Sequence, residues 1–509
     1  MTLPSDASPM PSNAPAFDRP EGAWLGHPRG VWLVSFTELW ERFSYYGVSS
    51  ILVLFLSGTT MAGGWGWSQE SALLFNGWYM GVLMMAPLIG GLLMVRHISE
   101  QRAIGWGAIL VVLGHLFFFL SHTAPHWTQW LTDRSTAALF AAPGLELGKL
   151  SPGAAAEAFA HVTDGEGSAA SAFALAYHAT AYLFYAAIAL LFFGTALIKP
   201  AVSSIIAGFY RKDDIRRGEG FQLLFFGLYL GCMLGITIPG LLGERIGWHM
   251  GFSVAGLGMA IGLCVYLYLR RDWIGQVGLV PLGGTDINYG DPATRRDRLR
   301  AYLVHGLFTI VYMAIFYQVI GLLSLYARDH VDRHLFGFEV PTTWIQNVSV
   351  ILFLLWTPCI GFVTRRLARR GRHFGTTAKS IGALAALASG FALLALATAD
   401  ARPTLIWFVA AYALFGLGDA LLGPSQVALA TRLAPTGRGG LYASGWFVFV
   451  GLGALLSGYI GAYSSQNIAI DTLLWILASV AIGAAGSYVL LAARLTRWSR
   501  GADDLPVAG

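Results

Sequence analysis

Charged residues are scarce in this chain of 509 residues, since Asp, Glu, Lys and Arg together make up only 12% of it. Soluble proteins carry about 25% charged residues, and 55% of the residues here are hydrophobic. A chain with so few charges cannot cover its apolar side chains with a polar surface in water. The composition therefore predicts an all-α integral membrane protein, in which each apolar run satisfies its own backbone groups as a helix.

Cysteine is also rare, with three residues, Cys232, Cys264 and Cys359, all inside apolar runs. Their spacing forms neither a disulfide framework nor a metal site. The sequence contains no GxSxG or HExxH motif, so we predict that the protein is not an enzyme and needs no cofactor. The net charge of +5 does not indicate nucleic-acid binding, because the basic residues sit in short loops between apolar runs.

Twelve apolar stretches recur along the chain, each long enough to span a membrane as a helix of about 20 residues. They cover 31–56, 70–95, 103–121, 179–208, 219–243, 248–269, 299–326, 343–364, 375–399, 404–432, 440–463 and 471–494. Arg and Lys concentrate in alternate loops between these stretches, which by the positive-inside rule places both termini in the cytoplasm.

Two blocks of six helices, joined by a cytoplasmic linker, predict two bundles that rock about a central site. The predicted parts are a disordered cytoplasmic tail at 1–30, an N-terminal bundle at 31–269 with a periplasmic insertion at 122–178, a linker at 270–298, a C-terminal bundle at 299–494 and a cytoplasmic tail at 495–509. Within the insertion we expect a short surface helix and no function.

Five acidic or basic residues lie deep inside the predicted spans, where each costs at least about 2.5 kcal/mol. They are Glu38, Glu41, Arg42, Lys199 and Asp419. Positions 38, 41, 42 and 45 share one face of a helix. We therefore expect the three charged residues of the first span to form a polar stripe with Tyr45.

The five charges sum to −1 when all are ionised, so one proton makes the site neutral. A zwitterionic solute leaves it neutral and finds a partner of opposite sign for each of its ends. A neutral loaded site can change conformation without carrying an unpaired charge through a closed state. This arithmetic favours a proton-coupled carrier. The alternative is a static ion cluster that only locks the helices together.

The run 38–47, ELWERFSYYG, matches the ExxERFxYYG motif of the proton-dependent oligopeptide transporters, a family of the major facilitator superfamily. The resemblance continues along nearly the whole membrane part. GTALIKP around Lys199, IGWHMGF from Ile246, LGD at Asp419 and the tryptophan Trp446 resemble spans 4, 6, 10 and 11 of that family. The resemblance implies the major facilitator fold, with twelve transmembrane helices in two six-helix bundles.

The family imports di- and tripeptides with protons, and the resemblance implies roles for the matching residues. The proton-coupling residues would be Glu38, Glu41, Arg42 and Lys199. Arg42 and Lys199 would also meet the peptide carboxylate, and Asp419 would meet the peptide amine. The expected substrate contacts are Arg42, Tyr45, Tyr46, Tyr79, Met84, Lys199, Tyr229, Gln318, Asp419 and Trp446.

The chain departs from the family at several neutral or gating positions. Ser49 stands in place of an arginine, and Gln318 stands nearest to a span 7 glutamate that pairs with that arginine as a gate. The loss of both the arginine and the glutamate is consistent, because either one alone would be an unpaired buried charge. Met84 and Tyr229 replace a tyrosine and an asparagine. The groups for proton and carboxylate are thus kept, while the pocket around them changes.

These observations predict a proton-coupled symporter that imports di- and tripeptides by alternating access. It would be a multi-pass protein of the cell inner membrane, active as a monomer, with peptide, proton and lipid as its partners and no nucleic acid. One alternative keeps the fold and changes the cargo to another zwitterionic or carboxylate solute, such as an amino acid or a modified peptide. More remote alternatives are a membrane sensor that does not transport and a membrane-embedded enzyme.

Overall fold

The computed structural model describes eight ranges of the chain and, within them, all side chains except those at 95–96, 122–132, 167–178 and 217–218. The ranges are 23–59, 63–132, 167–210, 216–279, 291–372, 374–400, 402–435 and 438–503.

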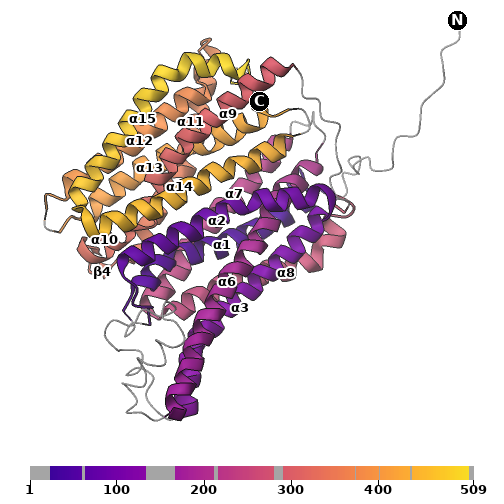
Figure 1. Ribbon diagram of the computed structural model, residues 1–509. Coiled ribbons are helices and arrows are strands. Elements are labelled where there is room, and N and C mark those ends of the chain that lie inside the picture. The colour runs from indigo at the N-terminus through magenta and orange to yellow at the C-terminus, as the bar shows by residue number, and fades with distance from the viewer. Residues whose placement is uncertain are drawn as a thin grey trace, which may run out of the picture.

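Six long helices from the first half of the chain form one bundle, drawn in indigo to magenta in Figure 1. They are α1 (Arg29–Ser57), α2 (Gln69–Arg96), α3 (Glu100–Thr132), α6 (Gly167–Gly208), α7 (Arg216–Arg245) and α8 (Trp248–Trp273). α1 packs against α7 and α8, while α3 packs against α6 and α8. The charged motif on α1 is therefore held from two sides inside this bundle.

The second half of the chain forms the other bundle, in orange to yellow in Figure 1. Its elements are α9 (Pro292–Phe316), the 3₁₀ turn η3 (Tyr317–Val319), α10 (Leu322–His330), α11 (Thr342–Arg369), α12 (Thr376–Ala397), α13 (Leu405–Leu433), α14 (Gly439–Asn467) and α15 (Ile470–Ser499), with a short hairpin of β3 (His334–Leu335) and β4 (Phe338–Glu339). The predicted span 299–326 is broken, because the backbone at Gly321 leaves the helical region with φ −90° and ψ −100°. α15 continues past the predicted span end at 494 into the predicted tail.

Within the described residues, eleven segments are long and apolar enough to cross a membrane. α1 is also 29 residues long, but it carries Glu38, Glu41 and Arg42 in its middle. Eleven segments and α1 make twelve. The predicted all-α major facilitator fold, with two six-helix bundles, is therefore confirmed.

The predicted disordered tail, 1–30, is ordered where it approaches the membrane part. β1 (Ala23–Trp24) and β2 (His27–Pro28) pair as an antiparallel hairpin. His27 Nδ1 lies 2.8 Å from the Tyr210 hydroxyl, so the hairpin docks just beyond the end of α6. This contact is long-range in sequence, which is why composition alone predicts disorder here. The residues before the hairpin lie outside the described ranges.

α9 begins at Pro292, inside the predicted linker 270–298. Asp291 caps the helix, because its Oδ2 accepts a hydrogen bond of 3.0 Å from the backbone N–H of Thr294. Proline suits the first helical position, where no N–H is needed. The same hydrogen bonds hold the pKa of the Asp291 carboxyl below its usual value. The polar linker is thus shorter than the sequence suggests.

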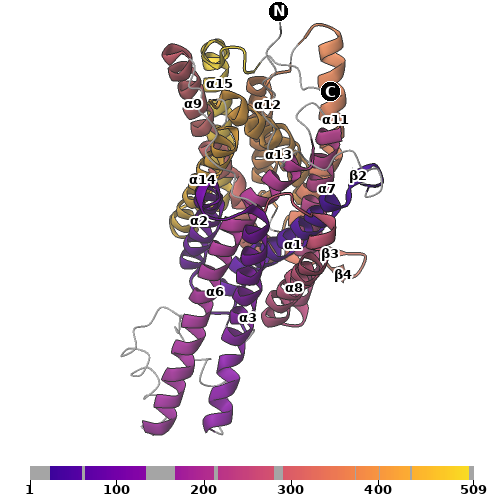
Figure 2. The ribbon, with the colours of Figure 1, turned by 90° about the vertical axis from the view of Figure 1, so that its right-hand side faces the viewer.

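The predicted insertion, 122–178, is helical at both of its ends. α3 continues to Thr132 and α6 begins at Gly167, so these two helices extend beyond the rest of their bundle (Figures 1 and 2). The stretch 167–178, which was assigned to the insertion, is rich in alanine, and alanine favours a helix. Residues 133–166, the middle of the insertion in which a short surface helix was expected, lie outside the described ranges.

The two bundles touch along α2 with α14 and along α7 with α11. At the first contact, Gly77 and Gly81 of α2 face Gly458 and Gly451 of α14. A Cβ atom added to Gly458 would lie only 2.7 Å from the Gly77 Cα. Small residues let the two backbones approach this closely, as expected for packing between membrane helices.

Candidate functional site

The polar stripe predicted on α1 converges on Arg42. Its Nε lies 3.1 Å from Glu38 Oε1 and 2.5 Å from Glu41 Oε2, and a second guanidinium nitrogen also pairs with Glu41. All three side chains are buried, with exposed fractions of 6% or less. Helical spacing brings position 38 beside position 42. A guanidinium has five N–H donors and stays charged, so it can serve both acids at once.

Each of the two carboxylates keeps one oxygen free. Among the described residues, Glu38 Oε2 and Glu41 Oε1 have no hydrogen-bond partner. An unpaired charged oxygen is costly in a buried site, and a bound proton lowers that cost. The acid pair therefore offers two positions for one proton beside a fixed cation.

Lys199 of α6 reaches the same stripe without pairing to a carboxylate of the described residues. Its Nζ lies 5.1 Å from the centre of the Tyr45 ring, 5.8 Å from that of Phe447 and 3.8 Å from Met84 Sδ. The Tyr45 ring also lies 5.2 Å from the Arg42 guanidinium carbon. Aromatic rings attract a cation but do not neutralise it. The ammonium thus retains its capacity for an anionic partner.

A small cavity adjoins Glu41, with room for about one water molecule. It lies among α1, α2, α3 and α6, and its lining includes Tyr45, Tyr79 and Thr195. Tyr46 packs edge-on against Tyr45, with ring centres 5.0 Å apart. Of the expected contact residues on α1 and α2, Tyr45 and Tyr79 therefore lie at the cavity beside Glu41.

A buried histidine supports the motif helix from α3. His115 Nδ1 lies 3.0 Å from the Phe252 carbonyl oxygen, which can only accept, so Nδ1 carries the hydrogen. The Ser44 hydroxyl then donates to His115 Nε2 at 2.5 Å. Ser44 also lines the cavity beside Glu41. His115 is therefore packed with both ring nitrogens bonded. The role of Ser44 has no sequence signal beyond its place in the motif.

Asp419 of α13 lies in the other bundle. Within the described part of the chain, no hydrogen bond or ion pair reaches its carboxylate. Tyr229 of α7 stacks on Phe353 of α11 with ring centres 4.0 Å apart, so the residue that replaces an asparagine of the family joins the two bundles.

Trp446 does not join the cluster around Lys199. Its ring packs against Tyr302 and Phe449 of its own bundle, with centres 5.8 and 5.5 Å apart. Its neighbour in sequence, Phe447, reaches Lys199 instead. Adjacent helical residues point about 100° apart, so a resemblance centred on the tryptophan misses the residue that makes the contact.

Gln318 and Ser49 each bond inside their own bundle. Gln318 Nε2 donates to the Ser457 carbonyl oxygen at 2.9 Å, and Ser49 Oγ donates to the Tyr45 carbonyl oxygen at 2.8 Å. Neither of these bonds crosses between the bundles. Gln318 borders a second small cavity, together with Asn76.

The arrangement places three charged groups apart from one another. The acid pair around Arg42 can hold a proton, Lys199 can hold an anionic group, and Asp419 can hold a cationic one. Lys199 and Asp419 belong to different bundles. A solute with a carboxylate at one end and an ammonium at the other would therefore contact both bundles through charge-assisted hydrogen bonds.

Comparison with known proteins shows the family and the fold of the chain. The model of the POT family matches residues 101–276 and 291–476. A peptide transporter of Yersinia enterocolitica is 25% identical over 507 residues, which cover 86% of this chain and 88% of that protein. A di-/tripeptide transporter of Lactococcus lactis is 23% identical over 498 residues, which cover 85% of this chain and 88% of that protein. A crystal structure of a POT family transporter in complex with 5-aminolevulinic acid is similar with a TM-score of 0.76, at 18% identity, over 94% of this chain and 99% of that one.

Proposed function

The chain belongs to the POT family of transporters, and from this premise we propose that it imports di- and tripeptides together with protons by alternating access. The relatives from Yersinia and Lactococcus, which transport peptides or di- and tripeptides by name, support this proposal. We further propose that it lies in the inner membrane with both termini in the cytoplasm, because this topology places the arginine-rich loops inside the cell. We also propose that it works as a monomer, because one chain supplies both bundles.

The observation that carries the proposal is the charge distribution at the site. Glu38, Glu41 and Arg42 form one buried group, whereas Lys199 and Asp419 stand apart without ion-pair partners among the described residues. A purely structural ion cluster would pair its charges, because an unpaired buried charge is destabilising. Two unpaired charges of opposite sign fit the two ends of a zwitterion.

The transport cycle follows from these positions. A proton binds the acid pair beside Arg42, and the peptide carboxylate binds Lys199. The peptide amine binds Asp419 of the other bundle, which draws the two bundles together around a neutral site. Loss of the proton to the cytoplasm restores a net negative charge and weakens the hold on the solute.

Uptake into proteoliposomes tests the proposal. Labelled dialanine and trialanine should accumulate under an inward proton gradient, and accumulation should vanish when the gradient is collapsed. Binding that is detectable in detergent without any gradient-driven uptake by folded, correctly inserted protein would sink the symport reading.

One alternative cargo has its own support. Met84 beside Lys199 and Tyr229 against Phe353 depart from the family pattern, and a transporter of similar fold has been solved in complex with 5-aminolevulinic acid. We therefore propose single amino-carboxylates as the second candidate class. A competition experiment decides between the two classes. If other dipeptides block dialanine uptake and 5-aminolevulinic acid does not, peptides are the substrate. If 5-aminolevulinic acid blocks the uptake and other dipeptides do not, the second class is favoured.

A further inference from the structure

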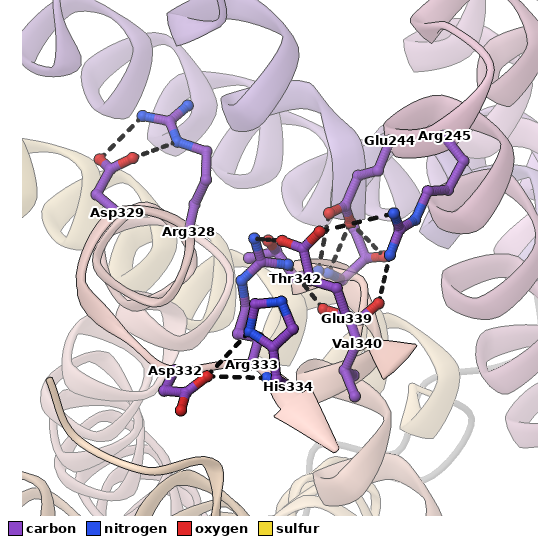
Figure 3. A network of polar contacts seen from close by, with 11 residues as sticks. Glu244, Arg245, Arg328, Asp329, Asp332, Arg333, His334, Glu339, Val340 and Thr342 are labelled. Atoms are coloured by element: carbon purple, nitrogen blue, oxygen red, sulfur yellow. Dashed lines mark hydrogen bonds and ion pairs between the residues drawn. The ribbon is translucent and has the colours of Figure 1, made fainter. Parts of the chain in front are cut away.

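The described hydrogen bonds between the two bundles gather at one end of the molecule. Figure 3 shows part of this group, with Glu244 and Arg245 of α7 beside Glu339 and Thr342. From the first bundle they involve Ser57, Gln69, Thr237, Glu244 and Arg245, and from the second bundle Arg328, Asp329, Glu339, Thr342, Thr343, Trp344 and Asn347. This end is opposite the arginine-rich loops, and the proposed topology places it outside the cell.

Glu244, at the C-terminal end of α7, makes the densest of these contacts. Its Oε2 accepts from the Thr342 backbone N–H at 2.8 Å. Its Oε1 accepts from the Thr343 backbone N–H and from the Thr343 hydroxyl, both at 2.9 Å. Both threonines are buried, with exposed fractions of 1% and 0%. One carboxylate of the first bundle thus binds three donors of the second.

α11 lacks a cap of its own at this end. Its N-cap residue is Pro341, which has no side-chain acceptor. The first backbone N–H groups of a helix have no partner inside the helix, and they attract negative charge. Glu244 therefore supplies the missing N-cap from the opposite bundle.

The surface of α7 is shaped for this contact. Thr237, Gly240 and Glu244 are spaced to lie on one face of the helix. The Asn347 side chain donates to the Thr237 hydroxyl at 2.7 Å. A side chain at Gly240 would collide with the Thr343 hydroxyl, so the glycine admits that residue. The Glu244 cap is therefore part of a row of contacts along the interface between α7 and α11.

The neighbouring ion pair is weaker. Arg245 lies 3.6 Å from Glu339, and both side chains are about 40% exposed. Ion pairs in contact with water contribute little to stability. Glu244, by contrast, makes charge-assisted bonds to buried amides, and breaking them leaves buried donors without a partner.

We propose that Glu244 is the latch of this end: it holds α7 to α11 while the site is closed there, and it must release the Thr342 and Thr343 amides before the site can open on that side. Release separates the Glu244 carboxylate from the start of α11. Water can then reach the carboxylate, the two backbone amides and the Thr343 hydroxyl. Ser49 and Gln318 replace the gating pair of the family but bond within their own bundles, so they do not hold the bundles together.

The chain provides its own reporter for the test. Cys232 lies on α7, about 18 Å from Glu244 along the helix, and is 1% exposed next to Arg42. In a Cys264→Ser, Cys359→Ser background, a membrane-impermeant maleimide added outside right-side-out vesicles labels Cys232 only when that end opens. Glu244→Gln places an amide NH₂ against a backbone N–H, and Glu244→Ala removes the cap.

We expect both variants to label about five-fold faster than the parent, with Thr343→Val, which loses one of the three bonds, in between. Glu339→Gln is the control and should label at the parental rate. Labelling at the parental rate in Glu244→Gln and Glu244→Ala, with both proteins monodisperse, overturns the proposal. The proposal is also overturned if Glu339→Gln raises the labelling rate of Cys232 as much as the Glu244 variants do. The readout needs no solute, so it stands apart from any failure of peptide uptake.

Discussion

Lys199 is a cation at membrane depth whose nearest groups are two aromatic rings and a thioether. Such a residue lowers the stability of the empty protein, because no carboxylate of the described residues offsets its desolvation. Its position at the interface with Phe447 of the other bundle makes a structural role a poor explanation. Binding of a solute carboxylate supplies the missing partner.

Lys199→Met tests this reading by keeping the length of the side chain and removing its charge. We expect the unfolding free energy to rise by about 1–3 kcal/mol, while gradient-driven uptake falls to background. Thermal unfolding and proteoliposome uptake measure the two effects. Lys379→Met, near the start of α12, is the control and should leave uptake unchanged. A less stable Lys199→Met protein would mean that the lysine is a structural partner.

Glu41→Gln mimics the protonated acid and cannot release a proton. Because the Arg42 guanidinium keeps Glu38 as a partner, we expect the variant to fold. It should still exchange labelled for unlabelled solute across the membrane, but it should not accumulate solute against a gradient. Glu219→Gln, at an exposed position, is the control for both assays. Full gradient-driven accumulation by Glu41→Gln would remove Glu41 from the coupling mechanism.

The residue-scale geometry was only partly predictable from the sequence. The contacts among Glu38, Glu41 and Arg42 follow from helical spacing, and the structure shows them. The contact of Lys199 with Tyr45 depends on how α6 packs on α1, which no local pattern specifies. The same limit explains why Phe447, and not Trp446, reaches the lysine.

At the scale of elements, α2 and α14 of the two bundles cross in close contact. Gly77 and Gly458 bring two backbones together there, and a larger side chain has no room. Two bundles that rock against each other need a contact that stays closed in every state. This glycine crossing has the geometry of such a pivot.

Gly77→Val should therefore separate α2 from α14. We expect it to lower the thermal unfolding temperature by several degrees and to reduce the maximal uptake rate more than the solute affinity. Gly483→Val in α15 adds the same side chain where the structure shows open space, and it should change neither property. Equal behaviour of the two variants would argue against a special role for the crossing.

The number and order of the long helices were predictable from the apolar runs of the sequence. Their ends were less so. α9 starts early because Asp291 caps it, and the hairpin of β1 and β2 depends on the contact of His27 with Tyr210. The Glu244 cap joins residues that are 98 positions apart, and no local pattern links a helix end to an acid so distant in sequence.

For the whole molecule, the account requires that solute accumulation follows the proton gradient. With the membrane potential clamped at zero and the inside pH fixed, lowering the outside pH by one unit should raise the limiting accumulation ratio about tenfold if one proton accompanies each solute. The sign follows from inward movement of the proton with the solute. Accumulation that is independent of outside pH would contradict coupling.

The most direct test of the central claim follows the proton itself. Proteoliposomes that contain a pH-sensitive dye receive dialanine outside, with no imposed gradient and the potential clamped. The account predicts that the interior acidifies upon addition of dialanine to the wild-type protein, and that Glu41→Gln abolishes this change. Dialanine entry without acidification of the interior would contradict it.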